Sequence, residues 1–278
     1  MLFIPMWASS GSPTQGALLV MRHCICVFLL LSCLALAACA TPVQPTDESR
    51  LISLADDIAQ RGDYATAAAM YERAAEVSGS SLDINVRLGK ARLAGGDPQG
   101  AVSAFRAALA SDIDNTEALL GLGSAQLQLG KTESAVRNLQ KAVPEIDTLS
   151  AWSRLGVAHA LLGQEQAAKD AFSQAVSLAP NDPDTLTNLA LAQSLAGDNA
   201  EAVALMHDVT ASPLAEERHF RNLILVLVMA GDTDQAASID IPDMSSSLRQ
   251  SLIEQARNIR DLPTPRDRAQ AMGLAMAN

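Results

Sequence analysis

A glycine recurs along this chain at an almost constant interval. Successive members lie 34, 34, 33, 34 and 34 residues apart, at Gly62, Gly96, Gly130, Gly163, Gly197 and Gly231. An interval of this length holds two helices with their turns, and one such pair is too small to bury its own apolar face. The period therefore predicts a stack of similar units that share one continuous core.

Three further sets of residues repeat in step with the glycines. An alanine follows each glycine by five residues, at Ala67, Ala101, Ala135, Ala168, Ala202 and Ala236. A large apolar residue follows by nine, at Tyr71, Phe105, Leu139, Phe172 and Met206, and fails only at Asp240. A small residue precedes the first five glycines by seven, at Ala55, Gly89, Gly123, Gly156 and Ala190. Small residues let two helices approach closely, and the large residue fills the space between units. Glycine suits the helix end because it enters the left-handed region without a Cβ penalty.

This pattern resembles the tetratricopeptide repeat (TPR) from Glu48 to about Asp243. The resemblance implies an all-α fold, a right-handed α-solenoid of about six helix-turn-helix repeats at 50–243. Only 3% of the residues are aromatic, which also disfavours a large sheet fold. Residues 244–260 carry an apolar stripe and predict a capping helix for the end of the stack. The tail at 261–278, which contains Pro263 and Pro265, is predicted to be loose.

The N-terminal region has the organisation of a secretory signal. The basic residues Arg22 and His23 precede an apolar run of about 15 residues, which is too short to span a bilayer as a helix. The run ends in Leu36-Ala37-Ala38-Cys39, which resembles the lipobox of bacterial lipoproteins. An uncleaved anchor or an ordinary signal with a stray cysteine is the alternative. We predict an N-terminal extension and signal peptide at 1–38, with translation starting at Met1 or Met21, and a lipidated cysteine and tether at 39–49.

The lipobox resemblance implies that Cys39 carries the lipid that anchors the protein to a membrane. Ala40 follows the cysteine, where an aspartate would resemble an inner-membrane retention signal. Its absence favours the outer membrane, with the folded body facing the periplasm.

Patterns for catalysis and metal binding are lacking in the sequence. All four cysteines lie within the first 39 residues, and neither an HExxH nor a Gly-x-Ser-x-Gly motif occurs. His159 falls in a packed first helix and is predicted to be a core residue rather than a ligand. A net charge of −11 without a Lys/Arg cluster disfavours nucleic acid, because nothing would neutralise its phosphates. We therefore predict no enzyme, metal, cofactor, small-molecule substrate or nucleic-acid partner.

In TPR proteins the first helices of the repeats line an inner groove that binds protein partners. Transferring the groove positions to this sequence gives Asp56, Lys90, Leu93, Leu127, Val157, Leu191, Arg221, Leu225 and Val228. This wall is mostly apolar and suits an amphipathic helix or an extended apolar segment, although the same residues would also suit packing alone. The lysine, asparagine and arginine set that clamps a C-terminal carboxylate in chaperone-binding TPR proteins is not evident. The apolar run Leu223 to Ala230 is predicted to pack beneath another element rather than to dock a partner.

The segment from Arg221 to Asp232 resembles the TadD family of Flp (Tad) pilus assembly lipoproteins, in which an arginine-asparagine pair leads into an apolar helix and Ala-Gly. The pilotins of type IV pili are similar six-repeat lipoproteins. These resemblances imply a lipid-anchored scaffold that binds pilus or secretion components such as a secretin. A periplasmic TPR adaptor that regulates enzymes of cell-wall synthesis or hydrolysis is the alternative, and the residues do not decide between the two.

Overall fold

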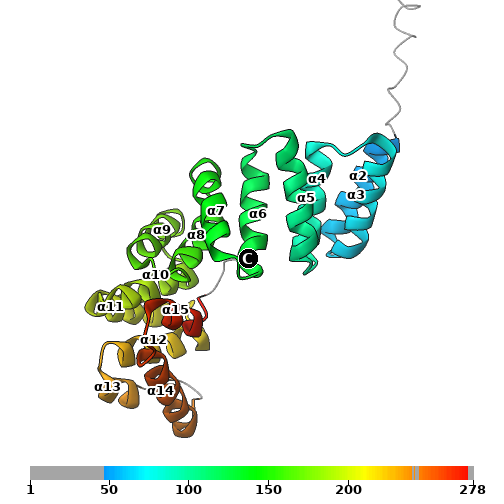
Figure 1. Cartoon of the computed structure of the whole chain (residues 1–278). Coiled ribbons are helices and arrows are strands. Elements are labelled where there is room, and N and C mark those ends of the chain that lie inside the picture. The colour runs from blue at the N-terminus through cyan, green and yellow to red at the C-terminus, as the bar shows by residue number, and fades with distance from the viewer. Residues whose placement is uncertain (1–46, 240, 242–243, 275–278) are drawn as a thin grey trace, which may run out of the picture. The chain divides into compact units, whose positions relative to one another are not determined.

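The computed structural model describes residues 47–239, 241 and 244–274, and every regular element within them is a helix. The helices follow one another as consecutive packed pairs, in chain order (Figure 1). The pairs are α2 (Asp47–Gln60) with α3 (Tyr64–Ser78), α4 (Leu82–Ala94) with α5 (Pro98–Ser111), α6 (Thr116–Gln128) with α7 (Thr132–Ile146), α8 (Leu149–Ala160) with α9 (Glu165–Leu178), α10 (Pro183–Ala196) with α11 (Asn199–Ala211), and α12 (Glu217–Met229) with α13 (Thr233–Ser238). The all-α repeat fold predicted from the period is confirmed.

The periodic glycines form the turns between the two helices of each repeat. All six adopt a positive φ, between 69° and 91°, which glycine reaches without a steric penalty. The next helix then begins at a capped residue in several repeats. The side chains of Asp63 and Asp97, for example, accept the backbone N–H groups of Thr66 and Gly100. The period in the sequence is therefore the period of these turns.

The other repeated residues form the core between the helices. All six periodic alanines are fully buried, and so are the large residues Phe105 and Phe172. A Cβ added at Gly89 would lie 2.7 Å from the Phe105 ring, and one added at Gly156 would lie 2.8 Å from the Phe172 ring. The small residue in the first helix is thus required because the ring of the second helix packs directly onto its backbone.

The first helices of successive repeats also pack on one another. Contacts join α4 with α6, α6 with α8, α8 with α10, and α10 with α12. These first helices therefore form one layer of the stack.

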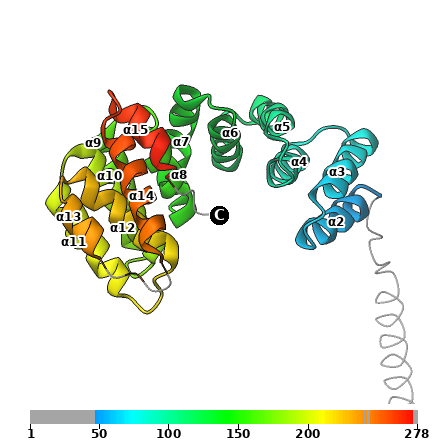
Figure 2. The same ribbon diagram turned by 90° about the horizontal axis from the view of Figure 1, so that it is seen from below.

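The C-terminal part of the described chain packs back onto this layer. α14 (Ser246–Arg260) packs against α12 and buries Ile253 and Ala256. The apolar residues Leu223 to Val228 of α12 are all buried, so this run serves packing, as predicted. α15 (Pro265–Met272) contacts α14, α10 and α8 (Figure 2).

The prediction of a loose tail at 261–278 is therefore wrong for α15. Thr264 caps this helix by accepting the backbone N–H of Asp267, and Pro265 occupies its first turn, where a proline is tolerated. Ala269, Met272 and the following Leu274 are buried in the same apolar cluster as α8, α10 and α12. Burial of these three side chains, which the polar neighbours in the sequence obscure, holds the segment in place.

The predicted signal at 1–38, Cys39 and the tether up to Thr46 lie outside the described residues. In the part of the chain that the structure describes, no helix is both long enough and apolar enough to cross a membrane.

Candidate partner-binding groove

Two adjoining cavities follow the layer of first helices in the N-terminal half of the described chain. One, of about 600 Å³, is lined mainly by α2 and α4, and the other, of about 760 Å³, is lined mainly by α4 and α6 and reaches Arg154 of α8. Tyr64, Lys90, Ala94 and Glu117 line both of them, so the two cavities adjoin one another at these residues. We call this pair of cavities the N-terminal groove.

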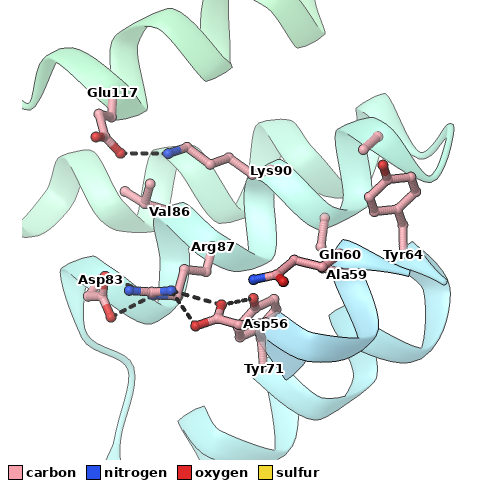
Figure 3. A pocket seen from close by; sticks show the side chains of 12 residues that line it. Asp56, Ala59, Gln60, Tyr64, Tyr71, Asp83, Val86, Arg87, Lys90 and Glu117 are labelled. Atoms are coloured by element: carbon pink, nitrogen blue, oxygen red, sulfur yellow. Dashed lines mark hydrogen bonds and ion pairs between the residues drawn. The ribbon is translucent and has the colours of Figure 1, made fainter. Parts of the chain in front are cut away.

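The α2 end of the groove holds a network of charges that joins the first repeat to the second (Figure 3). Arg87 Nη1 donates to both carboxylate oxygens of Asp56 at 2.7 and 2.8 Å, and its Nε donates to those of Asp83 at 2.9 and 3.0 Å. The Tyr71 hydroxyl donates to Asp56 at 2.5 Å. Burial and the hydrogen bond to Asp56 raise the pKa of Tyr71 to about 12. The pKa of Arg87 is raised by the hydrogen bonds that Arg87 donates to Asp83 and, to a smaller extent, to Asp56. These contacts fix α4 relative to α2 and α3.

A second ion pair crosses the groove between the next two repeats. Lys90 Nζ of α4 lies 2.7 Å from Glu117 Oε2 of α6 (Figure 3). Both side chains are more than half exposed, so solvent screens the pair and its net contribution to stability is small. Breaking this ion pair therefore costs little free energy.

The α6 end of the groove is mostly apolar. Leu93, Leu120 and Ile146 line it while remaining only partly buried, and the Phe105 ring forms part of its floor. Arg154 projects into these surroundings, and burial lowers its pKa. It makes no hydrogen bond or ion pair with any residue that the structure describes.

Four of the nine residues predicted to line the groove have solvent-accessible side chains. Asp56, Lys90 and Leu93 line the N-terminal groove, although Asp56 is bound to Arg87 and Tyr71. Arg221 is exposed on α12, where it pairs with Glu217 of the same helix at 2.6 Å.

The other five predicted groove residues lie in the core, which corrects the prediction for them. They share one apolar cluster with residues of α14 and α15, and they are Leu127, Val157, Leu191, Leu225 and Val228. For the last four, the physical reason is that α14 packs on α12 and α15 packs on α8 and α10, so that this part of the layer is covered by the chain itself. Leu127 belongs to α6, which packs on α7 and α8.

The sequence interpretation missed Arg154, the groove residue whose charge is unpaired. A signal for it exists, because Arg87 and Arg154 both stand immediately before a Leu-Gly pair of a first helix. His159, by contrast, is buried and its Nδ1 lies 2.6 Å from Gln164 Oε1, in agreement with the predicted core role.

An α-solenoid whose first helices line an open groove belongs to the class of protein-binding scaffolds. Sequence models of the tetratricopeptide repeat match residues 52–115, 86–150, 150–182 and 183–208, which together span more than half of the chain. The chain belongs to the tetratricopeptide repeat family.

Solved TPR structures share this fold at low sequence identity. The pilF protein of Pseudomonas aeruginosa is 20% identical, with a TM-score of 0.56 over 81% of this chain and 97% of its own. A tetratricopeptide repeat protein from Parabacteroides merdae is 16% identical, with a TM-score of 0.59 over 82% of this chain and 93% of its own. YrrB, a TPR protein with an unusual peptide-binding site, is 15% identical, with a TM-score of 0.53 over 68% of this chain and 92% of its own.

Among curated proteins, the CTR9 homolog of Arabidopsis thaliana is 27% identical over 138 residues. That stretch is 49% of this chain but spans only 13% of the relative's length.

Proposed function

We propose that this protein is a lipid-anchored, non-enzymatic scaffold that holds a partner protein in the N-terminal groove during Flp/Tad-type pilus assembly or secretion at the outer membrane. The observation that carries the proposal is the unequal covering of the first-helix layer. α14 and α15 cover α8, α10 and α12, whereas two adjoining cavities stay open along α2, α4 and α6. A groove that is mostly apolar at its α6 end and charged at its α2 end suits a protein segment in helical or extended form.

The pilus part of the proposal is supported by sequence. The segment Arg221–Asp232 resembles the TadD family, and Leu36 to Cys39 resembles a lipobox. The similarity to the pilF protein, which extends over nearly all of that chain, is compatible with a scaffold of the same architecture.

The proposal of a non-enzymatic role is supported by the way the groove uses its charges. Asp56, Asp83 and Glu117 are bound to arginine or lysine, which leaves none of these carboxylates free for acid-base work. The described residues also include no cluster of three or more His, Cys, Asp or Glu side chains that could hold a metal ion.

Crosslinking in intact cells, followed by affinity capture and mass spectrometry, tests the proposal. Leu93→Glu places a charge in the groove, whereas Leu178→Glu places the same charge on an exposed leucine of α9 and serves as the control. We expect a secretin or other pilus components with the wild type and with Leu178→Glu, and their loss with Leu93→Glu. Capture of peptidoglycan enzymes without any secretin would favour the cell-wall adaptor instead.

The anchor is tested separately. Cys39→Ser removes the sulfur that the lipobox would lipidate, so we expect the protein to move from the outer-membrane fraction to the soluble periplasm. A Cys39→Ser variant that stays in the membrane fraction would contradict the lipid anchor without affecting the groove.

A further inference from the structure

Two arginines occupy the same register in different repeats. Arg87 lies nine residues before Gly96, Arg154 lies nine residues before Gly163, and each directly precedes a Leu-Gly packing pair. Because the repeats have the same backbone geometry, the two side chains leave their first helices in equivalent directions. Both residues line the N-terminal groove, one in each cavity.

Arg87 shows which group a side chain in this register binds. Its guanidinium donates to two carboxylates, Asp56 of the preceding repeat and Asp83 four residues earlier in α4. The planar guanidinium offers several donors in a fixed geometry that matches the two oxygens of a carboxylate.

Arg154 keeps the arginine and lacks both carboxylates. Serines replace them in the equivalent places, since Ser124 corresponds to Asp56 and Ser150 to Asp83. The Ser124 hydroxyl donates to the backbone carbonyl of Leu120 in its own helix. The acidic residue that lines the same cavity, Glu117, is bonded to Lys90.

The surroundings of Arg154 make this arrangement unfavourable unless a partner completes it. Arg154 is only partly exposed, and this burial lowers the pKa of its guanidinium, while no described residue accepts its hydrogens. A partly buried charge without a partner carries a desolvation penalty that a carboxylate would offset. Apolar Leu93, Leu120 and Ile146 lie around it and offer contact to apolar side chains.

We infer that the N-terminal groove binds a segment of a partner protein in which an aspartate or glutamate lies among apolar residues, and that the Arg154 guanidinium donates to that carboxylate. The partner's carboxylate takes the place that Asp56 and Asp83 occupy at Arg87. This inference rests on the proposed function, because it assigns the chemistry of the segment that the groove holds.

The test uses random dodecamer peptides displayed on phage and selected on the purified full-length chain. We expect the selected peptides to be enriched in aspartate or glutamate next to apolar residues. For one selected peptide, fluorescence anisotropy then gives the Kd against the wild type, Arg154→Gln and Arg106→Gln. Arg106 is an exposed arginine of α5 outside both cavities, so its variant is the matched control for the loss of charge.

If Arg154 donates a charge-assisted hydrogen bond to the peptide, Arg154→Gln should raise the Kd of the peptide by about 10-fold to 100-fold, whereas Arg106→Gln should leave the Kd unchanged. Replacing the peptide's acid by its amide should weaken binding to the wild type equally and have no further effect on Arg154→Gln. Independent effects of the two changes would overturn the inference.

Two further outcomes separate the inference from the proposed function. If the peptides no longer bind Leu93→Glu but bind Arg154→Gln as tightly as the wild type, the groove is the binding site and the role inferred for Arg154 is refuted. If no selected peptide binds more weakly to Leu93→Glu than to the wild type, the groove is not the binding site.

Discussion

Replacing Arg87 or Arg154 with glutamine should separate an arginine that stabilises the fold from one that does not. The two residues stand in the same register of their repeats and lose the same charge. Arg87 gives up four hydrogen bonds of 2.7 to 3.0 Å to two carboxylates, and Arg154 gives up none among the described residues.

The expected magnitudes follow from these contacts and their exposure. Hydrogen bonds to charged groups contribute about 1.5–3 kcal/mol when shielded, but exposed ion pairs contribute less than about 1 kcal/mol. The side chains of Arg87 and Asp56 are 37% and 32% exposed, so the contribution of their ion pair to the free energy of unfolding should lie between these two values. We expect Arg87→Gln to lower the free energy of unfolding by about 1.5–3 kcal/mol in total, which is about 3–12 °C in Tm. Arg154→Gln should change the free energy of unfolding by less than about 0.5 kcal/mol, or raise it, because it removes an unpaired charge.

Urea denaturation followed by circular dichroism measures the difference, and hydrogen exchange locates it. Repeats in a solenoid depend chiefly on their nearest neighbours, so the faster exchange in Arg87→Gln should be confined to α2, α3 and α4. If Arg154→Gln lost as much stability as Arg87→Gln, Arg154 would have a structural partner. Such a result would refute an acidic partner from another protein as the group that Arg154 binds.

Three other perturbations test the packing of the core and the covering of the layer. The pKa of Tyr71 is raised to about 12, so the protonated, hydrogen-bonded tyrosine stabilises the fold fully below the unfolded-state pKa of about 10, and this stabilisation is lost as the pH rises through 12. Tyrosinate absorbance of Tyr64→Phe, in which Tyr71 is the remaining tyrosine, measures the titration. A pKa near 10 would contradict the hydrogen bond. Leu191→Ala should lower the free energy of unfolding by about 2–5 kcal/mol, because Leu191 is only 2% exposed, and the half-buried Leu93→Ala should cost clearly less in the same urea titrations. Met272→Asp should release α15 and speed hydrogen exchange there while α2 to α5 keep their protection; unchanged exchange in α15 would contradict its packing on α8 and α10.

The repeat could be predicted from the sequence because its determinants are local and recur in every unit. Gly96 fixes a turn through its own φ of 79°, and Gly89 admits the Phe105 ring within a single helix pair. Each of these constraints acts within about 34 residues, so six copies of the pattern predict the stack without knowledge of the rest of the fold.

The covering of the layer could not be predicted in this way. Leu191 lies on α10, and α15, which packs on α10, comes about 75 residues later and has no repeat pattern. The sequence of α15 is largely polar, and its burial rests on Ala269 and Met272, three residues apart on one face. A prediction that treats every repeat alike therefore assigns the same exposed side to all six, and it fails where a later segment occupies that side.

The partners of the charged residues could not be predicted from the repeat pattern either. The sequence places an arginine before the Leu-Gly pairs of two repeats. Only the packed repeats show that Arg87 binds two carboxylates, whereas Arg154 binds none among the residues that the structure describes. α8 carries Arg154 at the end of the N-terminal groove and also contacts α15, which covers the layer from there on. A partner segment that enters between α2 and α4 can therefore continue only as far as α8. It follows that the acidic residue inferred for Arg154 should lie at the end of the bound segment rather than in its middle, and the position of the acid within the selected peptides will show whether it does.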